Sequence, residues 1–368
     1  MKVALVHDYL SEFGGAERVL LALSEIWPEA PIYTAFYNKS SSAYERFKDK
    51  DIRPSWAQKI PGFASGKFHS PLRFITPWIW NSFDFSEYDL VVSSASWYIT
   101  KGFKQKGDAV EICYCHTPPR WLYGYPTSVE LQKYWPVRVY SAVVGHFLRL
   151  YDYQAAQRVD HFIANSKNVA DRIRKFYRRK SIVVYPPIEK LNYPDVPKED
   201  FYLIIGRLVG GKGFELAIEA VNQLGLNLKI AGKPAGWKQE QKRLENLAGD
   251  NVEFLGYVPD QKLAELYVKA RGFFVLATDE DFGMTPVEAM MAGTPVIAYR
   301  GGGYLESVVE GKTGVFFNEP TVESLIGAIK QFEKTKFFSQ ECQQWAEKFS
   351  KERFKKEITS FVAEKMAE

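Results

Sequence analysis

Short apolar runs alternate with amphipathic segments from one end of the chain to the other. The first run, residues 2–7, precedes segment 16–27, in which apolar residues recur at the three- and four-residue spacing of a helical face. This alternation of strand-like and helical segments predicts parallel β-sheets built from β–α–β units, and therefore an α/β fold. Ten further strand-like runs follow the first: 89–94, 110–115, 161–166, 181–186, 201–206, 226–232, 251–256, 271–278, 295–299 and 313–318.

A proline-rich segment at 186–197 interrupts this pattern. A single hydrophobic core rarely grows to the size that all 368 residues would need, so two domains are expected. We predict a first Rossmann-like domain over 1–185, a linker over 186–200 and a second Rossmann-like domain over 201–345.

The last part of the chain is charged and amphipathic. Its apolar positions include Trp345, Phe349, Ile358 and Phe361, which recur at a spacing typical of a helix that packs on a domain. We therefore predict a C-terminal helix over 346–368.

Composition adds three constraints. No run reaches the roughly 18 apolar residues that a membrane-spanning helix needs. The three cysteines give no disulfide framework, which fits a reducing cytoplasm. Residues 1–185 hold 25 basic against 17 acidic residues, whereas the remainder holds 23 against 27. The first half is therefore expected to meet an anionic partner.

The residues that follow each strand are the first place to look for chemistry, because parallel sheets bind ligands at the carboxyl ends of their strands. After the first strand, Gly14 and Gly15 open a helix. A glycine pair there lets backbone N–H groups approach a phosphate or a sugar, aided by the positive end of the helix dipole. The alternative interpretation is a tight strand-to-helix turn with no ligand.

His116 follows the strand 110–115 and precedes two prolines that stiffen its loop. Its position at a strand end indicates a functional role, and a purely structural histidine is the alternative. A metal site made by Cys113, Cys115 and His116 is not favoured. Adjacent residues of a strand point to opposite faces, and the sequence offers no second pair of ligands.

Arg207 and Lys212 lie on a glycine-containing turn between the strand 201–206 and the next helix. Two cations and unbonded backbone donors suit a diphosphate. The phosphate-binding motif G-x-x-x-x-G-K-[ST] is absent. Solvated surface charge is the alternative.

The segment "DEDFGMTPVEAMMAGTP", residues 279–295, follows the buried strand 271–278. Thr285 and Pro286 fit the N-cap and first positions of a helix, and Glu288 would then complete a capping box. That structural interpretation stands beside a functional one, in which the acids and Gly283 surround a ligand. A third alternative is a D-x-D site for Mg²⁺ or Mn²⁺ at Asp279 and Asp281.

Glu280 and Glu288, separated by seven residues, resemble the signature of retaining glycosyltransferases with the GT-B fold, and most closely glycosyltransferase family 4. The similarity covers most of the chain, and the wording of "EDFGMTPVE" and "CHTPPR" is most similar to bacterial mannosyltransferases of O-antigen and exopolysaccharide assembly. Seven further pieces carry it in the family's order: "GGAERV", "CHTPPRWLY", "FIANSKNVADRIRKFY", "VVYPPI", "GRLVGGKGFELAIEA", "FLGYVPDQKLAELYVKA" and "GGGYLESVVEGKTGVFF".

The resemblance implies two Rossmann-like domains that face each other across a cleft, with a final helix that crosses back to the first domain. It implies no metal cofactor and a nucleoside-diphosphate sugar as donor, GDP-mannose in the first instance. Asp281 departs from the family pattern, in which many relatives carry glycine, and this bears on the choice of sugar.

The resemblance also implies a role for each site residue. Arg207 and Lys212 would neutralise the leaving diphosphate, Glu280 would bind sugar hydroxyls and Glu288 the ribose. His116 would lie near the anomeric carbon. The remaining donor contacts would come from Gly14, Gly15, Tyr257, Val258, Phe282, Gly283, Met284 and Thr285.

The acceptor is suggested by residues 53–80, which hold Arg53, Lys59, Lys67 and Arg73 without an acidic residue. The same stretch contains six large aromatics: Trp56, Phe63, Phe68, Phe74, Trp78 and Trp80. Basic and aromatic residues together suit a lipid headgroup region, so a polyprenol-linked acceptor and peripheral contact with the inner face of the cell membrane are expected. A loop that only packs its aromatics is one alternative. Nucleic acid is another, although no nucleic-acid-binding motif is present.

Three other functions remain open at this level. The chain could use a UDP-sugar to transfer glucose or an N-acetylhexosamine. It could be a non-catalytic subunit that binds sugar nucleotides, against which the intact set of charged residues argues. A GT-B relative with epimerase or phosphorylase chemistry is the third. The spacing of the two glutamates favours transfer over epimerisation, and the sequence shows no lysine pattern of a phosphorylase cofactor site.

Overall fold

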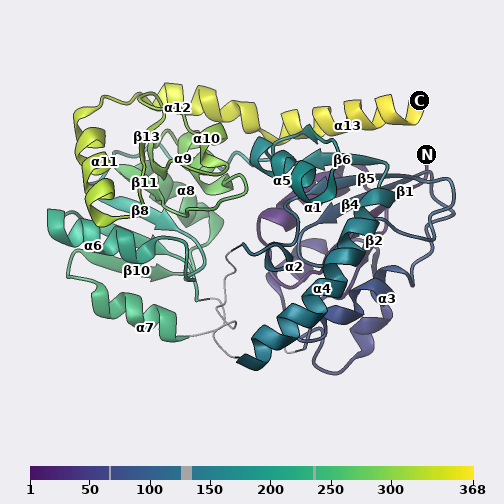
Figure 1. The fold of residues 1–368 in the computed structure, drawn as a ribbon. Coiled ribbons are helices and arrows are strands. Elements are labelled where there is room, and N and C mark those ends of the chain that lie inside the picture. The colour runs from purple at the N-terminus through teal and green to yellow at the C-terminus, as the bar shows by residue number, and fades with distance from the viewer. Residues whose placement is uncertain (66–67, 126–134, 235–237) are drawn as a thin grey trace. The chain divides into compact units, whose positions relative to one another are not determined.

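The computed structural model describes residues 1–65, 68–125, 135–234 and 238–368, and the chain divides into two compact units (Figure 1). Unit 1 comprises Met1–Pro187 and Glu352–Glu368, and unit 2 comprises Ile188–Lys351. Each unit is an α/β layer structure around its own parallel sheet.

The sheet of unit 1 has seven parallel strands in the order β3-β2-β1-β4-β5-β6-β7. The five strands predicted from the sequence are confirmed. Strands β2 and β3 were not predicted, because three residues are too few to show a period. The bounds are β1 Val3–His7, β2 Ile32–Thr34, β3 Ile52–Pro54, β4 Leu90–Ala95, β5 Val110–Cys115, β6 His161–Ala164 and β7 Ile182–Val183.

Helices cover both faces of this sheet, and the last of them comes from the end of the chain (Figure 1). Phe354, Ile358 and Phe361 of α13 are buried in the same core cluster as Leu5 and Leu90 of the sheet. The helices of unit 1 are α1 Gly15–Ile26, α2 Ser42–Phe47, α3 Thr76–Trp80, α4 Trp135–Arg158, α5 Lys167–Tyr177 and α13 Lys351–Ala367.

The sheet of unit 2 has six parallel strands in the order β10-β9-β8-β11-β12-β13, and all six were predicted. Its strands are β8 Tyr202–Ile205, β9 Leu228–Ala231, β10 Val252–Gly256, β11 Gly272–Val275, β12 Val296–Tyr299 and β13 Gly314–Phe317. Its helices are α6 Phe214–Leu224, α7 Lys238–Leu247, α8 Asp260–Lys269, α9 Met284–Met291, α10 Tyr304–Ser307, α11 Val322–Lys334 and α12 Ser339–Ala346.

The C-terminal stretch is not the single helix that its pattern suggests. Helix α12 ends at Ala346, a 3₁₀ turn covers Glu347–Phe349, and α13 begins at Lys351. The backbone N–H of Ile188 donates to the Phe349 carbonyl at 2.9 Å, which holds the break in place. The two parts also bury their apolar side chains in different units, Phe349 in unit 2 and Phe354 in unit 1.

In each sheet the order of the strands reverses at one place: the chain first adds strands on one side of its first strand and then on the other side. In unit 1 this switch point lies between β1 and β4, and in unit 2 between β8 and β11. Loops that leave the carboxyl ends of such a strand pair diverge to opposite sides and leave a crevice, where open parallel sheets bind ligands. The two switch points are therefore where a functional site is expected.

Within the described parts of the chain, no helix combines the length and the apolar character that a membrane crossing requires.

Candidate functional site

Lys212 and Glu280 meet at the switch point of unit 2. Lys212 lies on the loop between β8 and α6, and Glu280 lies on the loop between β11 and α9. The Lys212 Nζ is 2.6 Å from the Glu280 Oε2, and the side chains remain 39% and 21% exposed. An ion pair this exposed is worth at most about 1 kcal/mol, so a charged ligand could replace either partner at small cost.

Glycines let the surrounding loops approach each other. A Cβ on Gly213, whose φ is +78°, would lie 2.4 Å from the Leu276 Cβ. A Cβ on Gly302 would lie 2.4 Å from the Glu280 carbonyl oxygen, and the Gly303 N–H donates to that same carbonyl at 2.9 Å. The glycine run 301–303 therefore holds the backbone of Glu280. These glycines were not predicted to have a role, although three in a row, one residue after a strand, were a visible signal.

The capping-box interpretation of Glu288 is wrong. Helix α9 begins at Met284, with Gly283 at its N-cap in the left-handed conformation. Because glycine can adopt that conformation, the helix begins before Thr285, and Glu288 falls in its second turn. The Glu288 side chain is 4% exposed, and its Oε2 accepts a hydrogen bond from the Tyr267 hydroxyl at 2.8 Å. Tyr267, on α8, was not singled out from the sequence.

The other predicted residues of unit 2 lie on the same loops or near them. Arg207 is exposed on the loop that follows β8. Tyr257 is exposed after β10, with the Lys233 ammonium 4.5 Å from its ring centroid, and Val258 beside it is half-buried.

Phe282 and the start of α9 complete the predicted set. Phe282 is buried, and its ring centroid lies 5.4 Å from that of Phe349. Gly283 is buried at the N-cap of α9. Met284 and Thr285 are half-buried in the first turn.

Asp279 and Asp281, the candidates for a D-x-D metal site, are both half-buried on the loop after β11. Over the described ranges, no group of three or more histidine, cysteine, aspartate or glutamate side chains is arranged to hold a metal ion.

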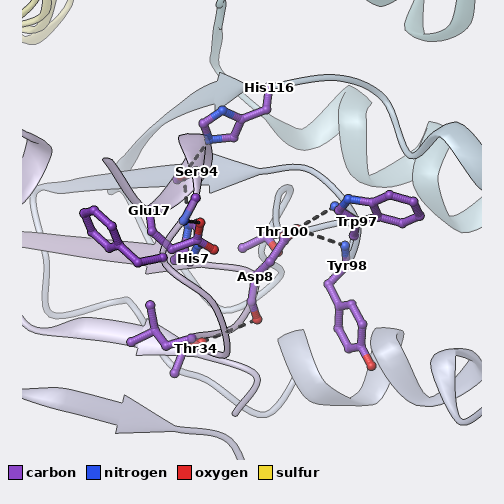
Figure 2. A network of polar contacts seen from close by, with 12 residues as sticks. His7, Asp8, Glu17, Thr34, Ser94, Trp97, Tyr98, Thr100 and His116 are labelled. Carbon is purple, nitrogen blue, oxygen red and sulfur yellow. Dashed lines mark hydrogen bonds and ion pairs between the residues drawn. The ribbon is translucent and has the colours of Figure 1, made fainter. Parts of the chain in front are cut away.

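In unit 1, His116 belongs to a chain of buried polar side chains at the β1/β4 switch point (Figure 2). Its Nε2 is 2.8 Å from the Ser94 Oγ, which is 3.0 Å from the His7 Nδ1. The His7 Nε2 faces the Glu17 Oε1 at 3.4 Å, and the Glu17 Oε2 accepts from the Gly14 N–H at 2.9 Å. This series of polar contacts thus runs from the glycine turn at Gly14 to His116.

Strand register creates this cluster. His7 and Ser94 are direct partners across β1 and β4, and His116 directly follows β5, the next strand. Gly14 is the N-cap of α1, and Gly15 is its first residue, as predicted. His7, Ser94 and Glu17 were not identified from the sequence, since histidines and serines at strand ends are common.

Burial fixes the charge of His116. It lowers the pKa of the imidazole from the ordinary 6.5 to about 3, and the neighbouring His7 acts in the same direction. His116 is therefore neutral at physiological pH and serves as a hydrogen-bonding group rather than as an acid.

Asp8, the neighbour of His7, is also buried. Burial raises the pKa of its carboxyl above the usual value, while hydrogen bonds from Thr100, Trp97 and Tyr98 act against that rise (Figure 2).

Two family models match the chain, one on each side of the division. Residues 13–190 match the model described as Glycosyltransferase Family 4, and residues 189–352 match the model described as Glycosyl transferases group 1.

Individual relatives are distant. The uncharacterized glycosyltransferase MJ1178 of Methanocaldococcus jannaschii is 27% identical over 217 residues, which span 58% of this chain and 61% of that protein. The alpha-1,3/1,6-mannosyltransferase alg2 of Schizosaccharomyces pombe is 24% identical over 85% of this chain and 70% of its own length.

The solved structure of Anabaena Alr3699/HepE in complex with UDP and glucose superposes with a TM-score of 0.76. The alignment has 18% identity and covers 99% of both chains. At that identity the match shows the fold, and it supports the predicted class of two Rossmann-like domains.

Proposed function

We propose that the chain, which is a glycosyltransferase of the GT-B fold, transfers mannose from GDP-mannose to a glycan or polyprenol-linked acceptor with retention of configuration. The acceptor would belong to the synthesis of a cell-surface polysaccharide. The observation that carries the proposal is the meeting of Lys212 and Glu280 at the switch point of unit 2.

Four charged residues of unit 2 have defined tasks in this proposal. Lys212 and Arg207 bind the diphosphate and stabilise the oxyanion as it leaves, through charges that are in place before the reaction. Glu280 accepts hydrogen bonds from sugar hydroxyls. Glu288 accepts from the ribose, and the hydrogen bond from Tyr267 orients its carboxylate.

The reaction would need no metal ion. In diphosphate chemistry a divalent cation neutralises charge on the leaving group, and two fixed cations from the chain can do the same. In this scheme Glu280 and Glu288 bind the donor substrate and neither acts as a nucleophile, so no covalent glycosyl intermediate is invoked. His116, neutral and hydrogen-bonded, would contact the sugar near the anomeric carbon.

The choice of mannose is supported by the name of the alg2 relative, a mannosyltransferase, and by the resemblance to bacterial mannosyltransferases. A second candidate is transfer from a UDP-sugar, which is favoured by the HepE structures in complex with UDP and with UDP-glucose. The two candidates share the diphosphate and the hexose, and they differ in the base and the sugar.

We also propose that unit 1 contacts a membrane, but through fewer residues of segment 53–80 than the sequence suggested. Phe63 and Trp80 are buried in the core, whereas Trp56, Phe68, Phe74 and Trp78 are exposed. Arg53 forms an ion pair with Asp51 at 2.8 Å. Arg73 lies 5.5 Å from the Trp97 ring and 4.9 Å from the Trp121 ring, and Lys67 lies outside the described residues. The apolar side chains, more than the cations, would contact the lipid.

Helix α4 extends this surface with an exposed apolar stripe. The stripe has the four- and three-residue spacing of one helical face and consists of Trp135, Val139, Val143, Phe147 and Leu150. The Tyr140 hydroxyl donates to the Pro71 carbonyl, which joins α4 to the aromatic segment. An apolar face of this kind on a helix suits the interfacial layer of a membrane.

The experiment is a donor panel followed by product analysis. GDP-mannose, UDP-glucose, GDP and UDP are compared for thermal stabilisation, which amounts to about 2.7 kcal/mol at 100 times the Kd. Each donor that binds is then incubated with and without EDTA, and the anomeric configuration of the released or transferred sugar is followed by NMR. A retained α-configuration from GDP-mannose in EDTA is expected. Stabilisation by no nucleotide sugar would overturn the proposal.

A further inference from the structure

Four side chains form an unbroken path of polar contacts from the first turn of α1 to His116 (Figure 2). Glu17, His7, Ser94 and His116 are all buried, and His116 is 8% exposed. Burial matters here because each contact must be a matched donor and acceptor, or a buried polar atom would be left at a cost.

Ser94 sits between two imidazole nitrogens and has only one hydroxyl hydrogen. It can donate to one ring and must accept from the other. A neutral imidazole likewise has one donor and one acceptor nitrogen. Once the hydrogen of His7 is placed, the direction of every bond in the path is therefore determined.

Glu17 places that hydrogen. An ionised carboxylate only accepts hydrogen bonds, and the position of Glu17 in the first turn of α1 favours its negative charge. Its Oε2 accepts from the Gly14 N–H, and its Oε1 faces the His7 Nε2. A neutral His7 must then carry its hydrogen on Nε2 and leave Nδ1 bare.

The remaining bonds follow in order. Ser94 donates to the bare Nδ1 of His7, so its Oγ accepts from the Nε2–H of His116. The Nδ1 of His116 is left as an acceptor, and in Figure 2 this nitrogen points away from Ser94.

We propose that Glu17, His7 and Ser94 are positioning residues that hold His116 in its Nε2–H tautomer and so present Nδ1 as the acceptor for a hydroxyl of the bound sugar. The role of the sugar rests on the proposed function, whereas the tautomer is a property of the chain without ligand. The two can therefore fail separately.

Glu17→Gln is the sharpest test, because it keeps the shape of the side chain and reverses the donor-to-acceptor direction of every hydrogen bond in the path. The Gly14 N–H still requires an oxygen, so the glutamine NH₂ must face the His7 Nε2 as a donor. His7 then carries its hydrogen on Nδ1 and donates to Ser94. Ser94 donates to the His116 Nε2, and the His116 hydrogen moves to Nδ1.

The readout is the long-range ¹H–¹⁵N spectrum of the full chain with labelled histidine, recorded without ligand at about pH 8, above the ordinary histidine pKa of ~6.5. The chain has five histidines, and His116→Asn and His7→Asn assign the two signals. For His116 we expect the Nε2–H tautomer in the wild type and the Nδ1–H tautomer in Glu17→Gln. In Ser94→Ala we expect a mixture of both tautomers, because the hydroxyl that selects one of them is removed. Ser93→Ala is the matched control, since Ser93 is equally buried on the same strand.

Nδ1–H in wild-type His116 would overturn the proposal, as would a tautomer that neither Glu17→Gln nor Ser94→Ala changes. If a variant does not fold, the wild-type spectrum alone still decides. With a working donor, Glu17→Gln should also lower kcat/KM about tenfold at an unchanged melting temperature. A wild-type protein that turns over no nucleotide sugar would defeat the proposed function, and the spectrum would still test the tautomer.

Discussion

The two switch points carry polar residues of opposite character. In unit 2 the residues are charged, partly exposed and carried by glycine-containing loops, as Lys212 and Glu280 show. In unit 1 they are buried and mutually hydrogen-bonded, and two of them, His7 and Ser94, are on the strands themselves. Exposed charges can exchange one partner for a ligand, whereas a buried network transmits a change at one member to the others. Substitutions should therefore act locally in unit 2 and through neighbours in unit 1.

The largest effect is expected at Lys212. Lys212→Ala removes a preorganised charge from the leaving diphosphate and should lower kcat by about 10²- to 10³-fold. The melting temperature should hardly move, because the pair with Glu280 is exposed. Lys229→Ala, which breaks the ion pair with Glu253 elsewhere in unit 2, is the control and should leave kcat unchanged. Equal kinetics for the two variants would remove Lys212 from the site.

The next effect separates binding from structure at Glu288. Glu288→Gln should weaken donor use by about 10- to 100-fold, because it loses a charged acceptor for the ribose. The glutamine can still accept from the Tyr267 hydroxyl, so stability should barely change. Tyr267→Phe is the complementary variant and should cost about 1–3 kcal/mol of stability, because the buried carboxylate loses a donor. Wild-type kinetics in Glu288→Gln would reduce Glu288 to a structural residue.

In unit 1 a pH effect on stability is expected. His116 has a folded-state pKa of about 3, below its ordinary 6.5, so the folded state resists its protonation. Its contribution is fully present above pH ~6.5 and is lost as the pH falls toward 3, with a slope of up to about 1.4 kcal/mol per pH unit. His116→Gln should flatten the decline of unfolding free energy between these limits. His146→Gln, an exposed position on α4, should keep the wild-type slope, and an equal slope in His116→Gln would contradict the assignment.

The smallest effect is expected on the α4 surface. Phe147, which is 66% exposed, should insert partly into the headgroup layer, so Phe147→Ser should reduce binding to anionic phospholipid vesicles several-fold. Phe338→Ser removes an exposed phenylalanine from unit 2 and is the matched control. Sedimentation with vesicles measures both. Equal binding of the two variants, or no binding of the wild type, would refute the membrane proposal.

The same contrast explains what the sequence could predict. Lys212 was found because it lies between two glycines on the turn after an apolar run, and Glu280 because it belongs to an acidic cluster directly after another apolar run. Both are local signals. The link from His116 to Ser94 was not found, since it depends on the order β1-β4-β5 and on a strand register that places His7 opposite Ser94. The three-residue strands β2 and β3 were also missed, because they are too short to show a period. The break at Phe349 was missed because its cause is a tertiary contact.

Glu288 shows a different kind of error. The residues Thr285, Pro286 and Glu288 satisfy a local capping rule, yet Gly283 can adopt a left-handed conformation that starts the helix earlier. A local preference was overridden by the preceding residue, and the buried hydrogen bond from Tyr267 came from another helix.

We propose that a nucleotide sugar binds at the β8/β11 switch point through the charges gathered there. Calorimetric titration of GDP-mannose and of UDP-glucose into the wild type, Lys212→Ala and Lys229→Ala tests it most directly. We expect that one of the two donors binds the wild type and Lys229→Ala equally, and binds Lys212→Ala at least about tenfold more weakly. Equal affinity of Lys212→Ala and the wild type, or binding of neither donor, would contradict it.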